Sequence, residues 1–463
     1  MGTQRRKRRG EEALPFPVPV TSVLETDPAR PLQSAEQRRV EAITRELAGT
    51  CGERLGMTRR EFLKTSCGMA AAFMALNSVF GDFFAVHPAE AADPAFAQAR
   101  RDALSGQFIF DVQTHFVSPR YGSEAILKLR EMAKKWNPQL KGEQESLEKI
   151  RFDNYYREIY ELSDTKIALL TSAPNDDPKK WFIHNDEIAK TREAVNRKAG
   201  RKIMYSHAVF TPGHPEWREA LDRAIVEYQP DAWKGYTTGA PFDSSRYPWR
   251  MDDEKLVYPA YERMAKAGIT NVCIHKGLLP PGYKKTMGKT WRYGSVADVG
   301  KAAKDWPQLN FIIYHAGIMK GEPPSRDDVK NFERTGHIPW VSELAAIPQQ
   351  YGVKNVYGEI GNTFALTAVS SPRYCAGILG TLIKGLGADH VLWGTDSVFY
   401  GSPQWQIEAF RRIEIPADLQ KKFGYTPLGP ADGEVKQLIF AGNGARLYKV
   451  KTEAGPDLVK AQR

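Results

Sequence analysis

Five polar residues in this sequence have the types and the spacing of a metal site with acid–base groups. Gln113 and His115 end an apolar run two positions apart, so in a strand both side chains would face the same side. Three later apolar runs end in His275, His315 and Asp396. Imidazole nitrogens together with carboxylate and amide oxygens suit a divalent ion that keeps an open position for water or substrate. We therefore expect one divalent metal, with Zn²⁺ first and Mn²⁺ or Fe²⁺ as alternatives.

Eight short runs rich in β-branched and aromatic residues would bring these side chains together. The runs cover residues 108–115, 166–172, 202–210, 232–236, 270–277, 310–317, 355–360 and 390–397. Stretches long enough for helices separate them, and strict alternation of strand and helix predicts a parallel sheet covered on both faces. Eight such strands predict an α/β fold, a (β/α)8 barrel of the TIM type. Catalytic residues of these barrels lie at the carboxyl ends of the strands, where the five polar residues fall.

The N-terminal part has the form of an export signal. Arg59 and Arg60 are followed by a short apolar stretch. The small residues of Ala89-x-Ala91 then form a site of the kind that signal peptidases cleave. We expect three regions: a disordered extension over 1–56, a twin-arginine signal region over 57–92 and the barrel over 107–450. The true start would then lie nearer Met57. The expected location is periplasmic or otherwise exported. The alternative to an export signal is a surface helix of the mature protein that happens to contain Arg-Arg.

Charge and cysteine content argue against a nucleic-acid-binding protein and against a disulfide-rich one. The 463 residues carry a formal net charge of +10, with both signs mixed beyond the N-terminal RRKRR cluster and no dense basic stripe with interleaved aromatic residues. Nucleic acid is therefore not an expected partner. Cys273 and Cys375 lie in apolar or helical contexts, which indicates buried thiols rather than a disulfide framework or a cysteine-rich zinc site.

The order of the motifs is similar to that of the amidohydrolase-related family. The shared features are D-x-Q-x-H after the first strand, a strand ending in His275, YHAG with His315, and WGTDS with Asp396. The resemblance covers about residues 107–450 and includes the closing FAGNGARLYKV. The family includes aminocarboxymuconate-semialdehyde decarboxylase and the resorcylate decarboxylases as well as hydrolases.

The resemblance implies a role for each residue. It implies that His115 and His275 are metal ligands, that His315 is the catalytic or substrate-polarising histidine, and that Asp396 is a ligand that also handles protons. Gln113 stands where the family has His or Glu. Because an amide oxygen is a weaker donor than imidazole, this substitution puts metal affinity and metal identity in question.

Two more residues lie inside the predicted strands. Lys234, near the end of the fourth run, is expected to bind an anionic substrate. A carbamylated lysine that bridges two metals, as in related barrels, and a surface lysine beside Trp233 are the alternatives. His207 is followed by apolar residues, and we interpret it as structural.

The resulting hypothesis is a metal-dependent hydrolase that acts on a small carboxylated or cyclic compound through metal-activated water. A metal-dependent decarboxylase of an aromatic or muconate-type acid is the first alternative. A non-catalytic binding protein of the cell envelope, on a degenerate barrel, is the second. The expected partners are a small-molecule substrate and the twin-arginine export machinery, and pairing of two copies into a homodimer stays open.

Overall fold

A single sheet of eight parallel strands forms the centre of the chain, in the order β1 to β8. The computed structural model describes residues 14–20, 34–122, 127, 146–399 and 401–450. The strands are β1 Phe110–Thr114, β2 Ile167–Leu170, β3 Met204–Val209, β4 Ala232–Tyr236, β5 Asn271–His275, β6 Asn310–Tyr314, β7 Val356–Glu359 and β8 Val391–Leu392. Each lies within one of the eight predicted runs.

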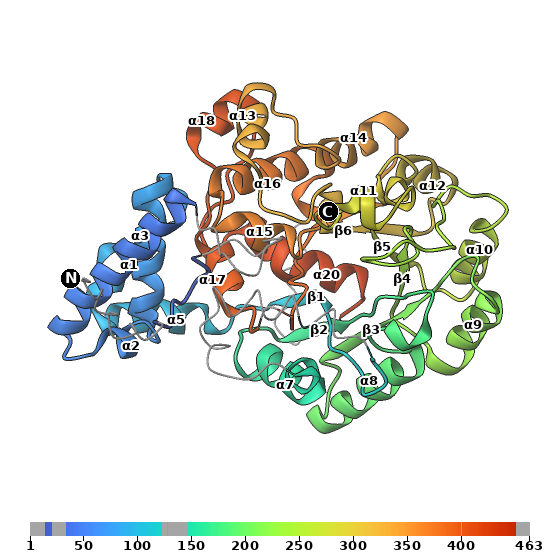
Figure 1. The fold of residues 1–463 in the computed structure, drawn as a ribbon, viewed down its shortest axis with the longest axis horizontal. Helices are drawn as coiled ribbons and strands as arrows, with labels where there is room; N and C mark the ends of the chain where they lie inside the picture. The colour runs from blue at the N-terminus through green and yellow to red at the C-terminus, as the bar shows by residue number, and fades with distance from the viewer. Residues whose placement is uncertain (1–13, 21–33, 123–126, 128–145, 400, 451–463) are drawn as a thin grey trace, which may run out of the picture.

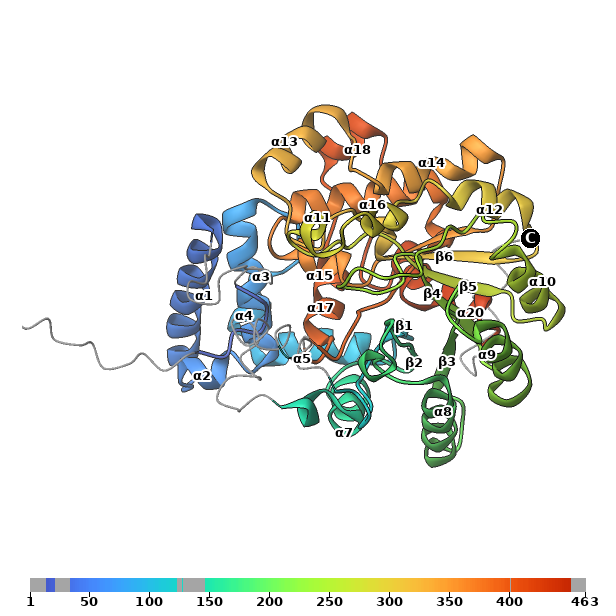
Figure 2. The same cartoon turned by 45° about the vertical axis from the view of Figure 1, so that its right-hand side comes forward.

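The sheet closes through the segment that follows β8. Thr114 pairs in parallel with Ser397, the Val112 amide donates to the Trp393 carbonyl at 3.0 Å, and the Asp396 amide donates to the Gln113 carbonyl at 2.9 Å. Helices surround the ring of strands (Figures 1 and 2). The predicted (β/α)8 barrel is therefore confirmed.

Helices lie between the strands in the alternation that the sequence predicts, and the last four α-helices of the described residues follow β8. From β1 onward they are α7 Phe152–Tyr156, α8 Asn185–Ala199, α9 Trp217–Arg223, α10 Tyr258–Lys266, α11 Tyr283–Thr286, α12 Val299–Asp305, α13 Arg326–Thr335, α14 Val341–Tyr351, α15 Thr363–Ala368, α16 Pro372–Leu386, α17 Gln404–Arg412, α18 Ala417–Phe423, α19 Glu434–Gln437 and α20 Asn443–Leu447. The lower barrel interior is packed with apolar side chains that include Phe110, Tyr205 and Tyr448, so the interior is a core and not a pore.

Among the described residues, five further helices precede the barrel and pack beside it (Figure 1). They are α1 Ala35–Arg54, α2 Arg59–Phe62, α3 Ser66–Phe80, α4 Pro88–Ala92 and α5 Pro94–Ser105. In the part of the chain that the structure describes, no helix is long and apolar enough to cross a membrane.

The predicted disorder of residues 1–56 is wrong for residues 34–54, which form α1 and its cap. Ser34 and Gln37 make a reciprocal capping box at its start. Val40, Thr44 and Ala48 recur every fourth residue and are buried. This buried stripe is narrow and consists of small or weakly apolar residues among many charged ones. The apolar periodicity that would predict a helix from the sequence is therefore weak. Residues 1–13 and 21–33 of the predicted extension lie outside the described residues.

Candidate functional site

The structure brings all five predicted polar residues into one chain of contacts at the carboxyl ends of the strands. Asp396 Oδ1 lies 2.9 Å from His115 Nε2 and accepts from Gln113 Nε2 at 2.8 Å. Gln113 Nε2 lies 3.5 Å from His315 Nε2, which lies 3.1 Å from His275 Nδ1. Residues from β1, β5, β6 and the segment after β8 therefore meet at one mouth of the barrel.

A bulge in β1 aims Gln113 and His115 at this mouth. The register of β1 against β2 shifts between Asp111 and Thr114. Val112 packs in the barrel interior, and the bulge lets the next residue, Gln113, face inward as well. Thr114 points away, where its hydroxyl lies 2.8 Å from Tyr155 Oη. The sequence predicted that positions 113 and 115 share a face but not the bulge beneath them.

Three residues of the site have left-handed backbone conformations. The φ angles are +61° at His315, +59° at Asn362 and +58° at Asp396. Such angles are uncommon outside glycine and are strained, and they gather where a functional side chain must be aimed. Asn362, which the sequence did not single out, donates to Asp396 Oδ2 at 3.3 Å. The turn at Asn362 thus brings its amide to the Asp396 carboxylate.

Glu359, at the end of β7, is a second residue that the sequence analysis missed. It is fully buried, and its two oxygens accept the backbone amides of His315 and Gly361, the former at 3.1 Å. Gly361 and Gly394 have no room for a Cβ, because the added atom would overlap Glu359 Oε1. An acidic residue at the end of the seventh predicted run was the available signal.

Burial sets the protonation of the site. Burial lowers the pKa of His315 to about 4, and burial together with His315 and Lys234 holds the pKa of His275 well below its usual value. Burial opposes ionisation of Asp396, but the hydrogen bond and charge of His115 outweigh it and lower the pKa of that carboxyl. At neutral pH the site therefore holds a carboxylate beside neutral imidazoles of His275 and His315.

The tautomer of His315 follows from its backbone partner. Its Nδ1 lies 2.8 Å from the Gly361 carbonyl, which can only accept, so Nδ1 carries the proton in the neutral ring. Nε2 then has the lone pair, and Nδ1 of His275, 3.1 Å away, must donate to it. His275 keeps the lone pair of its own Nε2. A neutral His315 is thus a proton acceptor at Nε2, whereas polarising a carbonyl would require a proton there.

Lys234 lies one layer deeper than the histidines. It pairs with Cys273 in the sheet register, while Tyr236 pairs with His275. Its side chain is fully buried, so the interpretation as a surface lysine is wrong. Nζ has no hydrogen-bond partner among the described residues and lies 3.4 Å from the centre of the Tyr314 ring. Burial lowers the pKa of Lys234 to about 7.

Aromatic rings border the polar cluster. Tyr236 stacks on His275 with ring centres 4.5 Å apart, and Phe399 stacks on His115 at 5.6 Å. Phe182 meets His115 edge-on at 5.8 Å. These rings exclude water from one side of each imidazole.

The donor set fits a divalent ion in part. His115 Nε2 and Asp396 Oδ1 are 2.9 Å apart, a spacing that two ligands of one ion with bonds of about 2.0–2.2 Å can have. Gln113 Oε1 is buried and accepts no hydrogen bond from any residue that the structure describes. Within those residues, no three His, Cys, Asp or Glu side chains stand together as metal ligands. An ion held here would therefore need the Gln113 amide, or His275, as a further donor.

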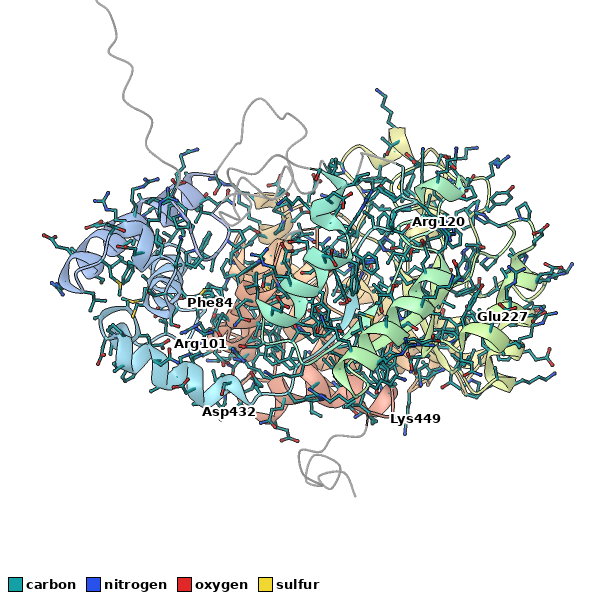
Figure 3. All side chains as sticks on the ribbon, turned by 90° about the horizontal axis from the view of Figure 1, so that it is seen from below. Phe84, Arg101, Arg120, Glu227, Asp432 and Lys449 are labelled. Carbon is teal, nitrogen blue, oxygen red and sulfur yellow. The ribbon has the colours of Figure 1, made fainter. Side chains whose placement is uncertain are left out.

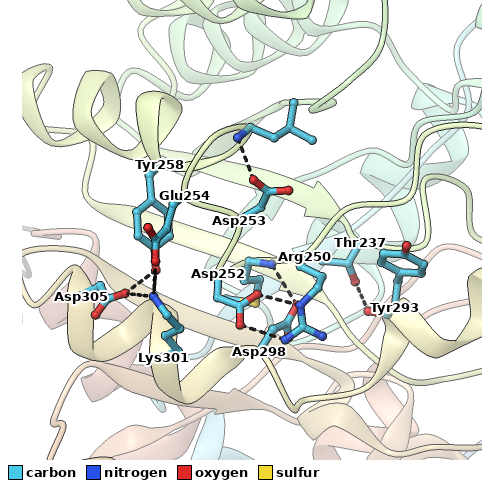
Figure 4. A network of polar contacts seen from close by, with 12 residues as sticks. Thr237, Arg250, Asp252, Asp253, Glu254, Tyr258, Tyr293, Asp298, Lys301 and Asp305 are labelled. Atoms are coloured by element: carbon cyan, nitrogen blue, oxygen red, sulfur yellow. Dashed lines mark hydrogen bonds and ion pairs between the residues drawn. The ribbon is translucent and has the colours of Figure 1, made fainter.

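A buried ion pair fixes the loop that follows His275. Lys276 Nζ lies 2.7 and 2.9 Å from the two oxygens of Asp298, and both side chains are almost fully buried. The Tyr293 carbonyl accepts from Lys276 at 3.0 Å and from Thr237 Oγ1 at 2.7 Å. Asp298 also accepts the Met251 amide at 2.9 Å. This network ties the loops after β4 and β5 together, and Figure 4 shows its Asp298 and the contact between Thr237 and Tyr293.

His207 is buried in β3, and its Nε2 lies 3.4 Å from Tyr314 Oη. Burial, with Lys234 and His115 nearby, lowers its pKa well below the usual value. It has no contact with the five polar residues in the hydrogen bonds described, which agrees with the structural interpretation.

Comparison with known proteins gives one family and several distant structures. A family model described as amidohydrolase matches residues 110–450. No curated protein matches the chain. An uncharacterized TIM-barrel protein from Bordetella bronchiseptica is 15% identical, with 74% of this chain and 98% of that chain covered and a TM-score of 0.48.

Two similar structures carry the name of an activity. A dihydroxybenzoic acid decarboxylase from Polaromonas, with bound manganese and the inhibitor 2-nitroresorcinol, is 14% identical over 75% of this chain and 98% of that chain, with a TM-score of 0.43. A putative 2-pyrone-4,6-dicarboxylic acid hydrolase from Pseudomonas putida is 14% identical over 75% and 99%, also with a TM-score of 0.43. At these identities the likeness assigns no activity to this chain.

Proposed function

Because the chain belongs to the amidohydrolase family over residues 110–450, we propose that it is a metal-dependent hydrolase of a small carboxylated or cyclic compound. The observation that carries the proposal is that Asp396 and His315 both contact the Gln113 amide at the mouth of the barrel, where His115 lowers the pKa of Asp396 and burial lowers the pKa of His315. A carboxylate and an imidazole lone pair are the groups that take protons from water during hydrolysis.

In this proposal His115, Asp396 and Gln113 hold the ion, with His275 as the further imidazole. A divalent ion, Zn²⁺ first and Mn²⁺ or Fe²⁺ as alternatives, would supply Lewis acidity to water or a substrate oxygen. His275 is neutral, as a ligand must be. The orphaned Gln113 Oε1 offers an oxygen donor of the kind that Mn²⁺ accepts more readily than a soft metal does.

Asp396 and His315 are the proton acceptors. Asp396 is held by His115, Gln113 and Asn362, so its carboxylate is fixed before substrate arrives. His315 Nε2 accepts a proton because Nδ1 is committed to the Gly361 carbonyl. Lys234 supplies positive charge beneath the site and favours an anionic substrate when it is protonated. A carbamylated Lys234 that bridges two metals would have to lie level with His275. The sheet register places Lys234 one layer lower, which argues against this alternative.

A metal-dependent decarboxylase of an aromatic acid is the second candidate. The observation in its favour is the aromatic border of the site, where Tyr236 and Phe399 stack on the two imidazoles that face the cluster. Flat rings of this kind suit a planar substrate. Decarboxylation would need a proton donor for the carbon that loses the carboxylate, and neutral His315 does not provide one at Nε2.

We further propose that the protein is exported by the twin-arginine machinery, because Arg59 and Arg60 precede a short apolar helix and this route carries folded proteins. The partner in catalysis is a small molecule.

The test is a panel of dihydroxybenzoic acids, 2-pyrone-4,6-dicarboxylate and simple lactones, incubated with protein loaded in turn with Zn²⁺, Mn²⁺ and Fe²⁺. Ring opening without CO₂ supports the hydrolase, and CO₂ release supports the decarboxylase. Asp396→Asn must abolish the turnover observed. If metal-loaded protein binds members of the panel but converts none of them, the result contradicts the enzyme hypothesis and supports a binding protein.

A further inference from the structure

The strongest unused group near the site is the Glu359 carboxyl, which bridges two of its turns. Glu359 accepts the amide of His315 from the turn after β6 and the amide of Gly361 from the turn after β7. Thr363 Oγ1 donates to the His315 carbonyl at 2.6 Å. Both sides of the His315 backbone are thus held by the segment after β7, and Gly361 also accepts from the His315 ring.

We infer that Glu359 is a positioning residue that fixes the left-handed turn of His315 and, through Gly361, its Nδ1–H tautomer. Without Glu359, two buried amides lose their acceptor and the strained φ of +61° at His315 loses its main restraint. The ring would then rotate away from Gly361 and lose the preference for Nδ1–H. The inference rests on the proposed role of His315, but the tautomer can be measured without substrate or metal.

The experiment is ¹⁵N NMR of histidine-labelled, metal-free protein, with His315→Asn used to assign the ring. Glu359→Gln keeps the volume but leaves one amide without an acceptor, and Glu359→Asp keeps the carboxyl group but shortens the reach. Each must displace the His315 ring nitrogens from the Nδ1–H pattern. The matched control is Glu343→Gln, because Glu343 lies 2.9 Å from the exposed His337 and should move that ring alone. An unchanged His315 signal in either Glu359 variant overturns the inference, whatever the substrate screen gives.

A separate observation concerns the predicted leader, which is joined to the barrel by backbone and side-chain contacts. The Ala85 amide donates to the Arg412 carbonyl and the Glu414 amide donates to the Phe83 carbonyl, both at 2.8 Å. Phe84 and Ile413 form the antiparallel bridge between them. Figure 3 shows Phe84 at the junction of the N-terminal helices with the rest of the chain.

A buried ion pair lies at the same junction. Arg412 Nη2 is 2.6 Å from Glu90 Oε2, and the two side chains are 4% and 5% exposed. The Arg412 guanidinium also donates to the Ala85 carbonyl at 3.2 Å and lies 5.4 Å from the centre of the Phe73 ring. Loss of the residues before Ala92 would remove Glu90, Ala85 and Phe73 from Arg412 and leave Glu408, at 3.6 Å, as its remaining carboxylate among the described residues.

The predicted cleavage segment is helical and partly covered. Glu90 and Ala91 lie inside α4 and are 4% and 2% exposed, whereas Ala89 is half-buried and Ala92 is exposed. Proteolytic processing acts on exposed, extended chain, and a helix with Glu90 and Ala91 buried does not present such a chain.

We propose that residues 34–105 stay attached to the folded protein as a permanent helical layer and that the chain is not cut at Ala91. The barrel face formed by α17 and residues 412–414 is the docking surface, and its occupant is the chain's own segment 66–92. This proposal is independent of the reaction and of the substrate.

Two measurements on one sample of full-length protein test it. Intact mass must include residues 34–105 in whichever cell fraction holds the protein, and hydrogen exchange must show residues 66–91 protected as the barrel strands are. Arg412→Met should raise exchange over 83–91 by roughly tenfold or more, because it removes the closer cation of the buried Glu90 carboxylate and leaves Arg100, at 3.4 Å, as the remaining one. The control Arg263→Met removes an exposed arginine paired with Asp222 and should leave that segment unchanged. A mature chain that starts at Ala92, or a segment 66–91 that exchanges like unfolded chain, overturns the proposal.

Discussion

Replacing Lys276 by methionine removes the buried cation beside His275 and keeps most of the side-chain volume. Lys276 and Asp298 have side chains that are 0% and 3% exposed, with Nζ 2.7 Å from the nearer carboxylate oxygen. In Lys276→Met the buried Asp298 keeps the Met251 amide as its partner among the described residues. The carboxylate is then buried without its hydrogen-bonded cation, and Arg250 is the remaining positive charge that acts on it.

The size of the effect follows from that burial. Removing one partner of a buried ion pair costs about 3–5 kcal/mol, and solvent screening does not reduce this figure for groups so little exposed. In domains of 150–250 residues each kcal/mol lowers Tm by about 2–4 °C, so we expect a decrease on the order of 10 °C in this larger chain. Asp298→Asn added to Lys276→Met removes the stranded charge and should restore most of the loss.

Thermal scans at one fixed rate, followed by circular dichroism, give the assay. The matched control is Lys266→Met, which removes an exposed lysine 2.8 Å from Glu262 and should give no measurable change in Tm. A Lys276→Met decrease no larger than the control's, or a double variant whose loss is the sum of the two single losses, would refute the reasoning that the pair holds this loop.

Three further predictions concern the site. Gln113→His should slow removal of metal by a chelator, because imidazole is a stronger donor than an amide; equal or faster removal contradicts a ligand role for position 113. Burial raises the pKa of Glu359 to about 8, above its unfolded value of 4.5. Its contribution to stability is therefore full below pH 4.5 and is lost as the pH rises through about 8. Urea midpoints should fall more steeply with pH in wild type than in Glu359→Gln, and parallel curves would contradict this. Gly394→Ala places a Cβ on Glu359 Oε1 and should destabilise by about 1–3 kcal/mol, whereas Gly106→Ala, in open space, should not; equal urea midpoints count against the packing described.

The sequence predicted the strands, and it predicted which polar side chains meet at their ends, because both follow simple periodicities. Apolar β-branched runs mark the eight strands, and polar residues at their ends mark the mouth of the barrel. Gln113 and His115 share a face as their spacing predicts. These features depend on residue type and on separation along one strand, which the sequence states directly.

The remaining features depend on neighbours that are distant in sequence. The bulge in β1 follows from its pairing with β2, and the left-handed turns at His315 and Asp396 follow from contacts with Glu359 and Gln113. Helix α1 was missed because its buried stripe matters only once α3 lies against it. A strand or helix pattern cannot report a conformation that a distant residue imposes.

Elemental analysis of purified protein tests the central claim, that His115 belongs to a divalent metal site. Wild type should carry about one equivalent of Zn, Mn or Fe per chain, as a mononuclear site holds, and His115→Ala should carry little. The control His337→Ala removes a half-exposed histidine paired with Glu343 and should keep the wild-type metal content. A wild type that is free of metal and also takes up none of the three when they are added would contradict the account.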